Sequence, residues 1–439
     1  MAEEQAERTS RVKTTEAGRK VPKLGKEMVR KPLEANAEGK PVAYTFITCL
    51  YDEIIRAMDI VPLWIEHYAG ITAAKRDQER FLSKAEAAGF SRSMCTYATC
   101  GIGFDVMRAE LGGAPPDAPW GGMARPDMML GAGEGTFCEP RYKWCPSVQQ
   151  YLPDVPFYAL NIPWPVYDPD IGLEEVKGYY IKHLVEELNG LVEFLEKQTH
   201  RKMDWDRLDE TVELGEKTYQ TWEAAVSLCQ NIPTPMGIED EMNIMVPGEF
   251  MLGTPEALQF YQDLYEELKY RVDNKIGIVP EEKHRCLWVG GLPPWFALAD
   301  FEYLKSKGVV VPAEAVYRPW WVPAEIPKTS NPLEKLAWRW FNYHTHWFEK
   351  ARKRPGSHPT VERLIEYIEK YKIDGLIVHL AFSCRTWHIG LLWQLNMVRK
   401  LYGDIPYLIL ESDIVDMSSY SEAETHARMD AFVDVLETR

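Results

Sequence analysis

Cysteines are the residues of this sequence whose positions point most directly to chemistry. Five of the eight lie in three loop-like segments, SMCTYATCGIG, GTFCEPRYKWC and FSCRTWH, and these are Cys95, Cys100, Cys138, Cys145 and Cys384. No two of them have Cys-x-x-Cys spacing, so neither a ferredoxin-type electron carrier nor a zinc ribbon is indicated. The others, Cys49, Cys229 and Cys286, lie in apolar or helical runs, and we expect them to be buried small hydrophobes.

Cys95, Cys138 and Cys384 lie at positions that favour thiolates. Cys138 and Cys384 each follow a predicted parallel strand within a few residues, and open α/β sheets bind ligands at the carboxyl ends of such strands. Cys95 begins a predicted helix, where the helix dipole and free N–H groups stabilise a thiolate. Three thiolates from separate loops would suit a [4Fe–4S] cluster with one iron open to substrate. Spacing alone, however, favours the alternative of scattered core thiols.

Eight short apolar segments, most of them followed by a helical pattern, must position these cysteines. We predict strands at 42–48, 63–65, 127–130 and 156–160 in the first half, and at 285–289, 309–311, 375–380 and 407–410 in the second. Strands that alternate with helices are typical of βαβ units and parallel sheets. The predicted fold class is therefore α/β, with two lobes that each hold a small parallel sheet flanked by helices, joined by a helical section.

This pattern divides the chain into four sections. They are a basic N-terminal arm at 1–36, a first α/β domain at 37–168, a helical connecting section at 169–278 and a second α/β domain at 279–439. We expect the arm to be mobile or to lie on a partner subunit. Residues 173–230 predict two long amphipathic helices, with Asp204 as the cap between them by its residue type. A further helix is predicted at 255–272. Helices predicted within the two α/β domains include 73–88, 141–151, 360–371 and 388–402.

Charge and hydropathy exclude several classes of protein. The net charge of −16 argues against the basic face that nucleic-acid binding needs. The first twenty residues contain no apolar signal-peptide core, and no stretch approaches the ~20 apolar residues of a membrane span. We therefore expect a cytoplasmic protein that binds neither nucleic acid nor membrane. Cytoplasmic thiols are kept reduced, so the cysteines are expected to be ligands or core residues and not disulfides.

Four segments carry a resemblance to a known family, in the order SMCTYATCGIG, MMLGAGEGTFCEPRYKW, DGLIVHLAFSCRTW and IPYLILESDIVD. From about residue 41 to its end, the chain resembles the benzoyl-CoA reductase / 2-hydroxyacyl-CoA dehydratase family. The resemblance implies two similar α/β domains and a [4Fe–4S] cluster held by three cysteines, which match Cys95, Cys138 and Cys384 here. Cys100 and Cys145 are departures from that pattern, and Cys100 faces elsewhere if its helix is regular.

Within that family, the sequence looks most like the larger core subunit of the ATP-dependent benzoyl-CoA reductases. This implies one-electron reduction of an aromatic acyl-CoA thioester, with benzoyl-CoA as the favoured substrate. It also implies a homologous core subunit as a partner, and an ATP-hydrolysing electron activator on separate chains with a ferredoxin upstream. Two alternatives stay open, namely a subunit of a 2-hydroxyacyl-CoA dehydratase and a non-catalytic iron–sulfur electron-relay protein.

Two residues near the third cysteine segment are candidates for catalysis. The imidazole of His379 could donate a proton to a reduced substrate, or it could be a strand histidine satisfied in the core. Arg385 could polarise a thioester carbonyl or pair with a carboxylate. Trp340, Tyr343 and Trp347 recur at helical spacing, which predicts a buried stripe, although some of these aromatics could line a pocket for an aromatic acyl group.

Overall fold

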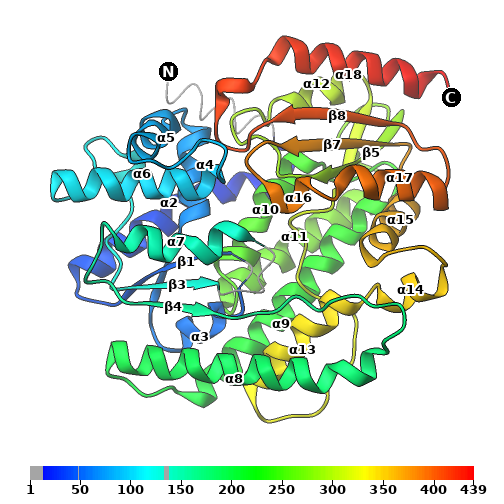
Figure 1. Ribbon diagram of the computed structural model, residues 1–439. Helices are drawn as coiled ribbons and strands as arrows, with labels where there is room; N and C mark the ends of the chain where they lie inside the picture. Colours follow the sequence, from blue (N-terminus) through cyan, green and yellow to red (C-terminus); the bar gives the residue numbers. More distant parts are fainter. Residues whose placement is uncertain (1–12, 48, 133–137) are drawn as a thin grey trace.

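The computed structural model describes residues 13–47, 49–132 and 138–439, which contain two parallel four-stranded sheets. The strands are β1 (Val42–Thr45), β2 (Val61–Trp64), β3 (Met128–Ala132) and β4 (Phe157–Leu160), then β5 (His284–Gly290), β6 (Val309–Glu314), β7 (Gly375–Ala381) and β8 (Tyr407–Ser412). The strand orders are β2-β1-β3-β4 and β6-β5-β7-β8, so both sheets repeat one topology. We call the half around β1–β4 lobe 1 and the half around β5–β8 lobe 2 (Figure 1).

The strand positions confirm the predicted fold class. All eight predicted strands are present within a few residues of their expected places, and every pairing between them is parallel. Strands β1, β3, β6 and β7 are buried along their whole length. Continuous apolar runs without alternation are what a parallel sheet requires when helices cover both of its faces.

One of the helices predicted in lobe 1 differs from the structure. Lobe 1 contains α3 (Asp52–Ala57), α4 (Ile65–Ala74), α5 (Gln78–Ala87), α6 (Thr96–Leu111) and α7 (Glu139–Gln149). The single helix predicted at 73–88 is wrong, because α4 ends at Ala74 and Arg76 has a left-handed φ of 57°. A left-handed residue cannot continue a right-handed helix, so a separate helix begins at Gln78.

The three helices predicted for the section between the lobes are present, and one further helix lies before the last of them. The section contains α8 (Leu173–Thr199), α9 (Trp205–Ser227), the further helix α10 (Ile238–Phe250) and α11 (Pro255–Asp273). Asp204 caps α9, where its side chain accepts a hydrogen bond of 3.0 Å from the backbone N–H of Arg207. Helix α10 is buried along almost its whole length and packs against β6 of lobe 2. The section is therefore part of the core and more than a linker.

Residues of the expected N-terminal arm form a packed helix instead. Helix α2 (Glu16–Ala37) lies against α10 and β2, and Val21 and Val29 are among its buried residues. Asp240 fixes its start by accepting hydrogen bonds from the backbone and the hydroxyl groups of Thr14 and Thr15. The expectation of a mobile arm is wrong for residues 16–37, because an apolar face at helical spacing is buried against the core. Residues 1–12 lie outside the described part of the chain, and the other domain boundaries stay predictions.

The remaining helices follow β5 in the chain. They are α12 (Asp300–Ser306), α13 (Pro332–Thr345), α14 (Phe348–Lys353), α15 (Pro359–Tyr371), α16 (Arg385–His388), α17 (Leu391–Leu401) and α18 (Glu422–Glu437). One of them, α13, packs against α8 and α9 of the helical section. Trp340, Tyr343 and Trp347 are all buried, which confirms the predicted aromatic stripe. The helix predicted at 388–402 is α17, which begins three residues later than expected because the short helix α16 ends at His388.

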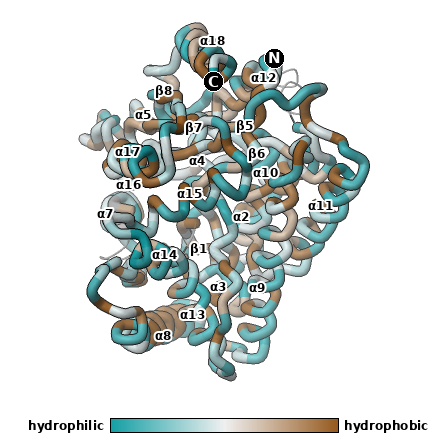
Figure 2. The backbone as a smooth tube through the Cα atoms, turned by 90° about the vertical axis from the view of Figure 1, so that its right-hand side faces the viewer, coloured by the Kyte–Doolittle hydropathy of each residue, from teal (hydrophilic) through white to brown (hydrophobic). Residues whose placement is uncertain are grey.

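Buried apolar side chains of both lobes and of the helices between them form one continuous core. Figure 2 shows hydrophilic and hydrophobic segments alternating along α9 and α11, as expected for helices with one buried face. Within the described residues, no helix is long and apolar enough to cross a membrane. The two lobes are therefore packed on one core, and residues from both of them can line a common site.

Candidate functional site

One pocket brings Cys95, Cys138 and Cys384 together. It encloses about 760 Å³ of empty space, part of it open to solvent. The rest of its lining is Phe46, Ile47, Ile65, Glu66, Tyr97, Ala98, Pro140, Arg141, Leu292, Val316, Tyr317, Trp320, Thr386, Trp387 and Ile414. These residues come from both lobes, so the pocket lies where the two sheets face each other. The structure therefore brings together the three cysteines that the sequence predicts as ligands.

The shared topology explains why two of the cysteines meet. Cys138 follows β3 and Cys384 follows β7, which are the third strands of sheets with the same strand order. In such sheets the strand order reverses beside the first strand, and the loops after the first and third strands leave a crevice there. Cys95 reaches the same pocket from the loop before α6.

Each of the three cysteines is the residue directly before a helix. Cys95 precedes α6, Cys138 precedes α7 and Cys384 precedes α16. Free backbone N–H groups and the positive end of the helix dipole lie at such positions and favour negative charge. The predicted place of Cys95 at a helix start is confirmed, and the other two cysteines share it.

Burial opposes ionisation of these thiols. Burial raises the pKa of Cys95 well above its usual value, and the neighbouring Cys138 and Cys384 raise it further, while backbone N–H groups of Ala98 and Tyr97 act the other way. Burial likewise raises the pKa of Cys384 to about 11, with Cys138 adding to the effect. Negative charge on one of these sulfurs therefore opposes ionisation of its neighbours. A bound cation would supply the missing positive charge.

The donor set of the pocket consists of three thiols. In residues 13–47, 49–132 and 138–439, no group of three Cys, His, Asp or Glu side chains is already arranged to hold one metal ion. A single ion needs its ligands drawn tightly around it, whereas an iron–sulfur cluster is bound by thiolates that stand farther apart. Three half-buried thiols around one pocket are ligands of the type that such a cluster takes.

Glu66 and Arg141 form a buried ion pair in the pocket wall. Arg141 Nη2 lies 3.2 Å from Glu66 Oε1, and both side chains are more than nine-tenths buried. Burial raises the pKa of Glu66 to about 7, although Arg141 opposes the rise. Its second oxygen, Oε2, is buried without a hydrogen-bond partner among the described residues. The carboxyl group can therefore hold or accept a proton near neutral pH.

Sequence reasoning missed both members of this pair. Glu66 lies two residues after β2, and Arg141 lies three residues after Cys138. For Glu66 the available signal was its position just beyond a strand end, where α/β proteins gather functional side chains, and for Arg141 it was its closeness to Cys138. Arg141 also lies within the segment MMLGAGEGTFCEPRYKW, whereas Glu66 lies outside all four segments that carry the family resemblance.

Aromatic side chains form much of the remaining wall. Phe46, Tyr97, Tyr317, Trp320 and Trp387 line the pocket. Trp320 stacks on Trp340 of the predicted stripe, with ring centroids 5.6 Å apart and ring planes only 3° from parallel. Trp340 of the stripe thus packs against Trp320 of the pocket wall. Such a surface favours an apolar, flat group, since stacked and edge-on rings are attractive contacts.

The two predicted catalytic residues do not line this pocket. His379 is buried on β7, where its Nε2 lies 2.8 Å from Ser412 Oγ, and it borders a different cavity with Trp288 and Tyr420. Burial lowers the pKa of His379 to about 4, so the ring is neutral. Arg385 is exposed at the start of α16. The placement of His379 matches the alternative of a core histidine.

The other five cysteines are buried away from the pocket lining. Cys100 lies on the buried side of α6 with its sulfur 3.3 Å from Thr72 Oγ1, as its helical spacing from Cys95 predicted. Cys145 packs behind β3, close to Gly131. Cys229 and Cys286 are core residues, and Cys49 Sγ lies 4.0 Å from Arg141 Nη1 just outside the wall.

Comparison with known proteins agrees with the resemblance found in the sequence. The family model for the 2-hydroxyglutaryl-CoA dehydratase D-component matches residues 49–436. One subunit of the benzoyl-CoA reductase of Thauera aromatica is 26% identical over 413 residues, covering 91% of this chain and 90% of the relative. The (R)-phenyllactyl-CoA dehydratase alpha subunit of Clostridium sporogenes is 23% identical over 413 residues, covering 92% and 91%. The (R)-2-hydroxyisocaproyl-CoA dehydratase alpha subunit of Clostridioides difficile is 24% identical over 419 residues, covering 94% of each chain. The chain therefore belongs to the 2-hydroxyglutaryl-CoA dehydratase D-component family.

Proposed function

We propose that this chain is a core subunit of an ATP-dependent benzoyl-CoA reductase, with a [4Fe–4S] cluster held by Cys95, Cys138 and Cys384. The observation that carries the proposal is the pocket in which these three thiols face an aromatic wall. When bound, such a cluster supplies single electrons at low potential. The substrate would be an aromatic acyl-CoA thioester, and benzoyl-CoA is the favoured one.

The chain's own residues have three tasks in this proposal. Tyr317, Trp320 and Trp387 would hold the ring of the acyl group against the thiol side of the pocket and exclude water. Glu66, whose pKa is raised to about 7 by burial, would give a proton to the reduced ring. Arg141 would keep the Glu66 carboxyl group in place through their ion pair.

A radical dehydration of a 2-hydroxyacyl-CoA is the second candidate function. Two observations favour it, because dehydratase alpha subunits are among the relatives and a carboxyl group with a pKa of about 7 can also accept a proton. The two reactions differ in electron use, since a dehydration returns its electron whereas a ring reduction consumes two. A non-catalytic electron relay would show no acyl-CoA turnover at all.

The proposal includes partners that act outside this chain. The sequence holds no Walker-type phosphate-binding pattern, so ATP hydrolysis would take place on separate activator chains. A homologous core subunit would pair with this one, and a ferredoxin would supply the activator. Chemistry of this kind is expected in the cytoplasm, where thiols stay reduced.

Iron and sulfide analysis with EPR on anoxically purified protein tests the cluster. We expect about four irons per chain, lost in Cys95→Ala, Cys138→Ala and Cys384→Ala. The matched control is Cys286→Ala, which removes a fully buried thiol on β5 outside the pocket. Iron that is absent from the wild type, or that persists in all three variants, would overturn the proposal.

Turnover assays then separate the two reactions. The protein, with its partner subunit and activator, should consume two electrons per benzoyl-CoA. Turnover of a 2-hydroxyacyl-CoA with catalytic amounts of reductant would instead establish the dehydratase.

A further inference from the structure

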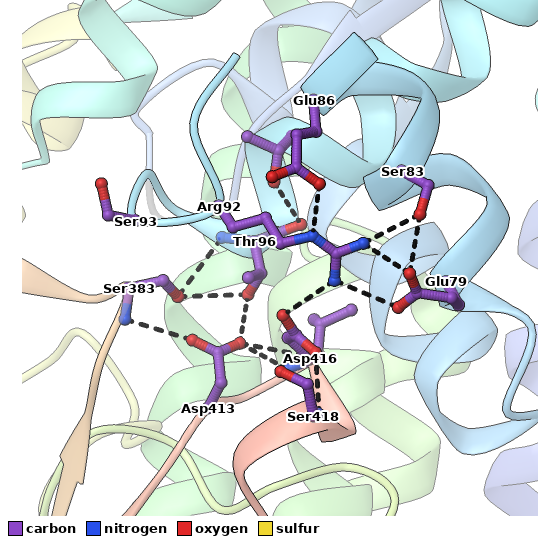
Figure 3. Close-up of polar contacts among 12 residues, drawn as sticks. Glu79, Ser83, Glu86, Arg92, Ser93, Thr96, Ser383, Asp413, Asp416 and Ser418 are labelled. Atoms are coloured by element: carbon purple, nitrogen blue, oxygen red, sulfur yellow. Dashed lines mark hydrogen bonds and ion pairs between the residues drawn. The ribbon is translucent and has the colours of Figure 1, made fainter.

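We propose that Asp413 is a positioning residue that ties the loops of Cys95 and Cys384 together across the two lobes. The inference rests on the proposed function only in taking these cysteines as cluster ligands. We call Asp413, Thr96 and Ser383 the inter-lobe clamp. Figure 3 shows these three side chains converging, with Thr96 from lobe 1 and the other two from lobe 2.

The clamp contacts the immediate neighbours of both cysteines. Thr96 follows Cys95, and its hydroxyl donates to Asp413 Oδ1 at 2.6 Å. Ser383 precedes Cys384, and its backbone N–H donates to Asp413 Oδ2 at 3.1 Å. One carboxylate therefore holds the residue next to each cysteine, one oxygen for each loop.

A direct contact closes the clamp. The backbone N–H of Thr96 donates to Ser383 Oγ at 3.3 Å, and the two hydroxyl oxygens are 3.2 Å apart. Thr96, Ser383 and Asp413 are each at least 95% buried. Buried hydrogen bonds of a carboxylate are strong, and leaving their donors without an acceptor is costly.

Asp413 is itself fixed to its own sheet. It lies directly after β8, and its Oδ1 also accepts from the backbone N–H groups of Val415 at 3.0 Å and Asp416 at 3.1 Å. The carboxylate therefore accepts four hydrogen bonds, three of them from backbone groups. A side chain held in this way has little freedom to shift, so it can set the place of the loops that bind it.

A second contact outside the clamp links the same two lobes. The guanidinium group of Arg92 pairs with Glu79 and Glu86 of α5, and its Nη1 lies 3.3 Å from Asp416 Oδ2. Figure 3 shows Arg92 between these carboxylates. Because Arg92 is partly exposed, this link is weaker than the buried one.

The need for the clamp follows from where the cysteines lie. Cys95 and Cys138 both belong to lobe 1, whereas Cys384 alone comes from lobe 2, before a helix of only four residues. A cluster bound by all three requires the Cys384 loop to stay at a constant distance from lobe 1. The clamp holds the Cys384 loop at this distance from lobe 1 even when no cluster is bound.

Two measurements on Asp413→Asn test the inference. Hydrogen–deuterium exchange of the iron-free protein measures how firmly the two loops are held, because the backbone amides of Thr96 and Ser383 both donate hydrogen bonds within the clamp. The rate at which the cluster-loaded protein releases iron to a chelator measures how well the cysteines still hold the cluster. We expect both loops to exchange at least tenfold faster and iron to leave about 10- to 100-fold faster, the usual effect of losing a residue that orients ligands.

Thr96→Val and Asp300→Asn complete the design. Thr96→Val removes the hydroxyl group that donates to Asp413 and keeps the shape of the side chain. If Asp413→Asn does not fold, the same two measurements on Thr96→Val test the clamp. Asp300→Asn is the matched control, since Asp300 is a largely buried carboxylate of lobe 2 that accepts from Tyr420 and does not contact the clamp. We expect it to leave both readings unchanged.

Each outcome has a defined meaning. The inference is wrong if both loops of Asp413→Asn and Thr96→Val exchange at the same rate as in the wild type. It is also wrong if the loops exchange faster but iron is released at an unchanged rate. If the wild type binds no iron, the proposed function fails, and a joint rise of exchange in both loops still supports the clamp.

Discussion

The two lobes share one strand order but supply different chemistry to the pocket. Lobe 1 supplies two of the thiols and the Glu66–Arg141 ion pair, whereas lobe 2 supplies Cys384 and the side chains of Tyr317, Trp320 and Trp387. The buried ion pair thus belongs to one lobe, whereas apolar side chains come from both, and three of the five aromatic ones come from lobe 2. The comparison teaches that topology fixes where functional loops meet, while the loop residues decide what each side contributes.

The similarity of the lobes is greatest at the third strand. Cys138 and Cys384 both follow that strand and both precede a helix. The position suits a ligand for a physical reason, since the loop is short, the strand is buried and the helix N-terminus favours a thiolate. No counterpart of Cys95 is among the lining residues from lobe 2.

The largest effect expected of a single non-cysteine change is that of Glu66→Gln in lobe 1. It removes the ionisable group and keeps the shape, so kcat of acyl-CoA turnover should fall about 10²- to 10⁴-fold while the iron content stays constant. His379→Gln, in lobe 2, should change kcat less than about twofold, since His379 lies off the pocket. Steady-state kinetics of the two variants checks the assignment. Equal losses would show that proton transfer is not confined to lobe 1.

The pH dependence of kcat should carry the signature of Glu66. Burial raises its pKa to about 7, so the carboxyl group is protonated below pH 7 and ionised above it. As a proton donor in ring reduction, Glu66 would make kcat fall as the pH rises through 7. As an acceptor in dehydration, it would make kcat rise over the same window. Glu66→Gln should abolish the inflection in either case, and an unchanged profile would exclude Glu66 as its source.

Trp320→Leu, in the aromatic wall of lobe 2, should have the next largest effect. The change removes a ring that stacks on Trp340, so kcat/KM for benzoyl-CoA should fall about 10- to 100-fold. Trp347→Leu is the matched control, because Trp347 is buried in lobe 2 but does not line the pocket. A similar loss in both variants would mean that the effect arises from packing of the lobe and not from substrate contact.

The comparison between lobes also shows what the sequence could predict. The eight strands were predictable because each is a short apolar run with turn residues nearby, and Cys138 and Cys384 stand out just beyond two of them. The split of 73–88 into two helices was not, since it depends on the backbone of Arg76. Nor was the packing of α2, since its partner α10 lies far along the chain, beyond the whole of lobe 1.

Sequence distance was a poor guide to the site itself. His379 is only five residues from Cys384, yet strand geometry turns its side chain to another cavity. Glu66 and Asp413 lie in other segments of the sequence than the cysteines whose surroundings they share, and the pairing of strands within each sheet brings them there. Their roles depend on tertiary contacts that no local pattern encodes.

Asp240→Ala should lower the stability of lobe 1 more than that of lobe 2. It removes the hydrogen bonds that hold Thr14 and Thr15 at the start of α2, which packs on β2. We expect a loss of about 2 kcal/mol, typical of a broken buried network. Denaturant titration measures it, and hydrogen exchange locates it. Uniformly faster exchange in both lobes would contradict the local role of α2.

The smallest effect is expected for Arg385→Gln, and it tests the difference between the arginines that follow Cys138 in lobe 1 and Cys384 in lobe 2. Each third-strand cysteine has an arginine shortly after it, but Arg141 is buried in the pocket wall and Arg385 is exposed outside it. Arg385→Gln should therefore change kcat/KM less than about twofold. Arg141→Gln should reduce it far more, because Glu66 would lose the cation that opposes the rise of its pKa. If the two variants were equally impaired, polarisation of the substrate by lobe 2 would have to be restored to the proposal, and the division of chemistry between the lobes would not hold.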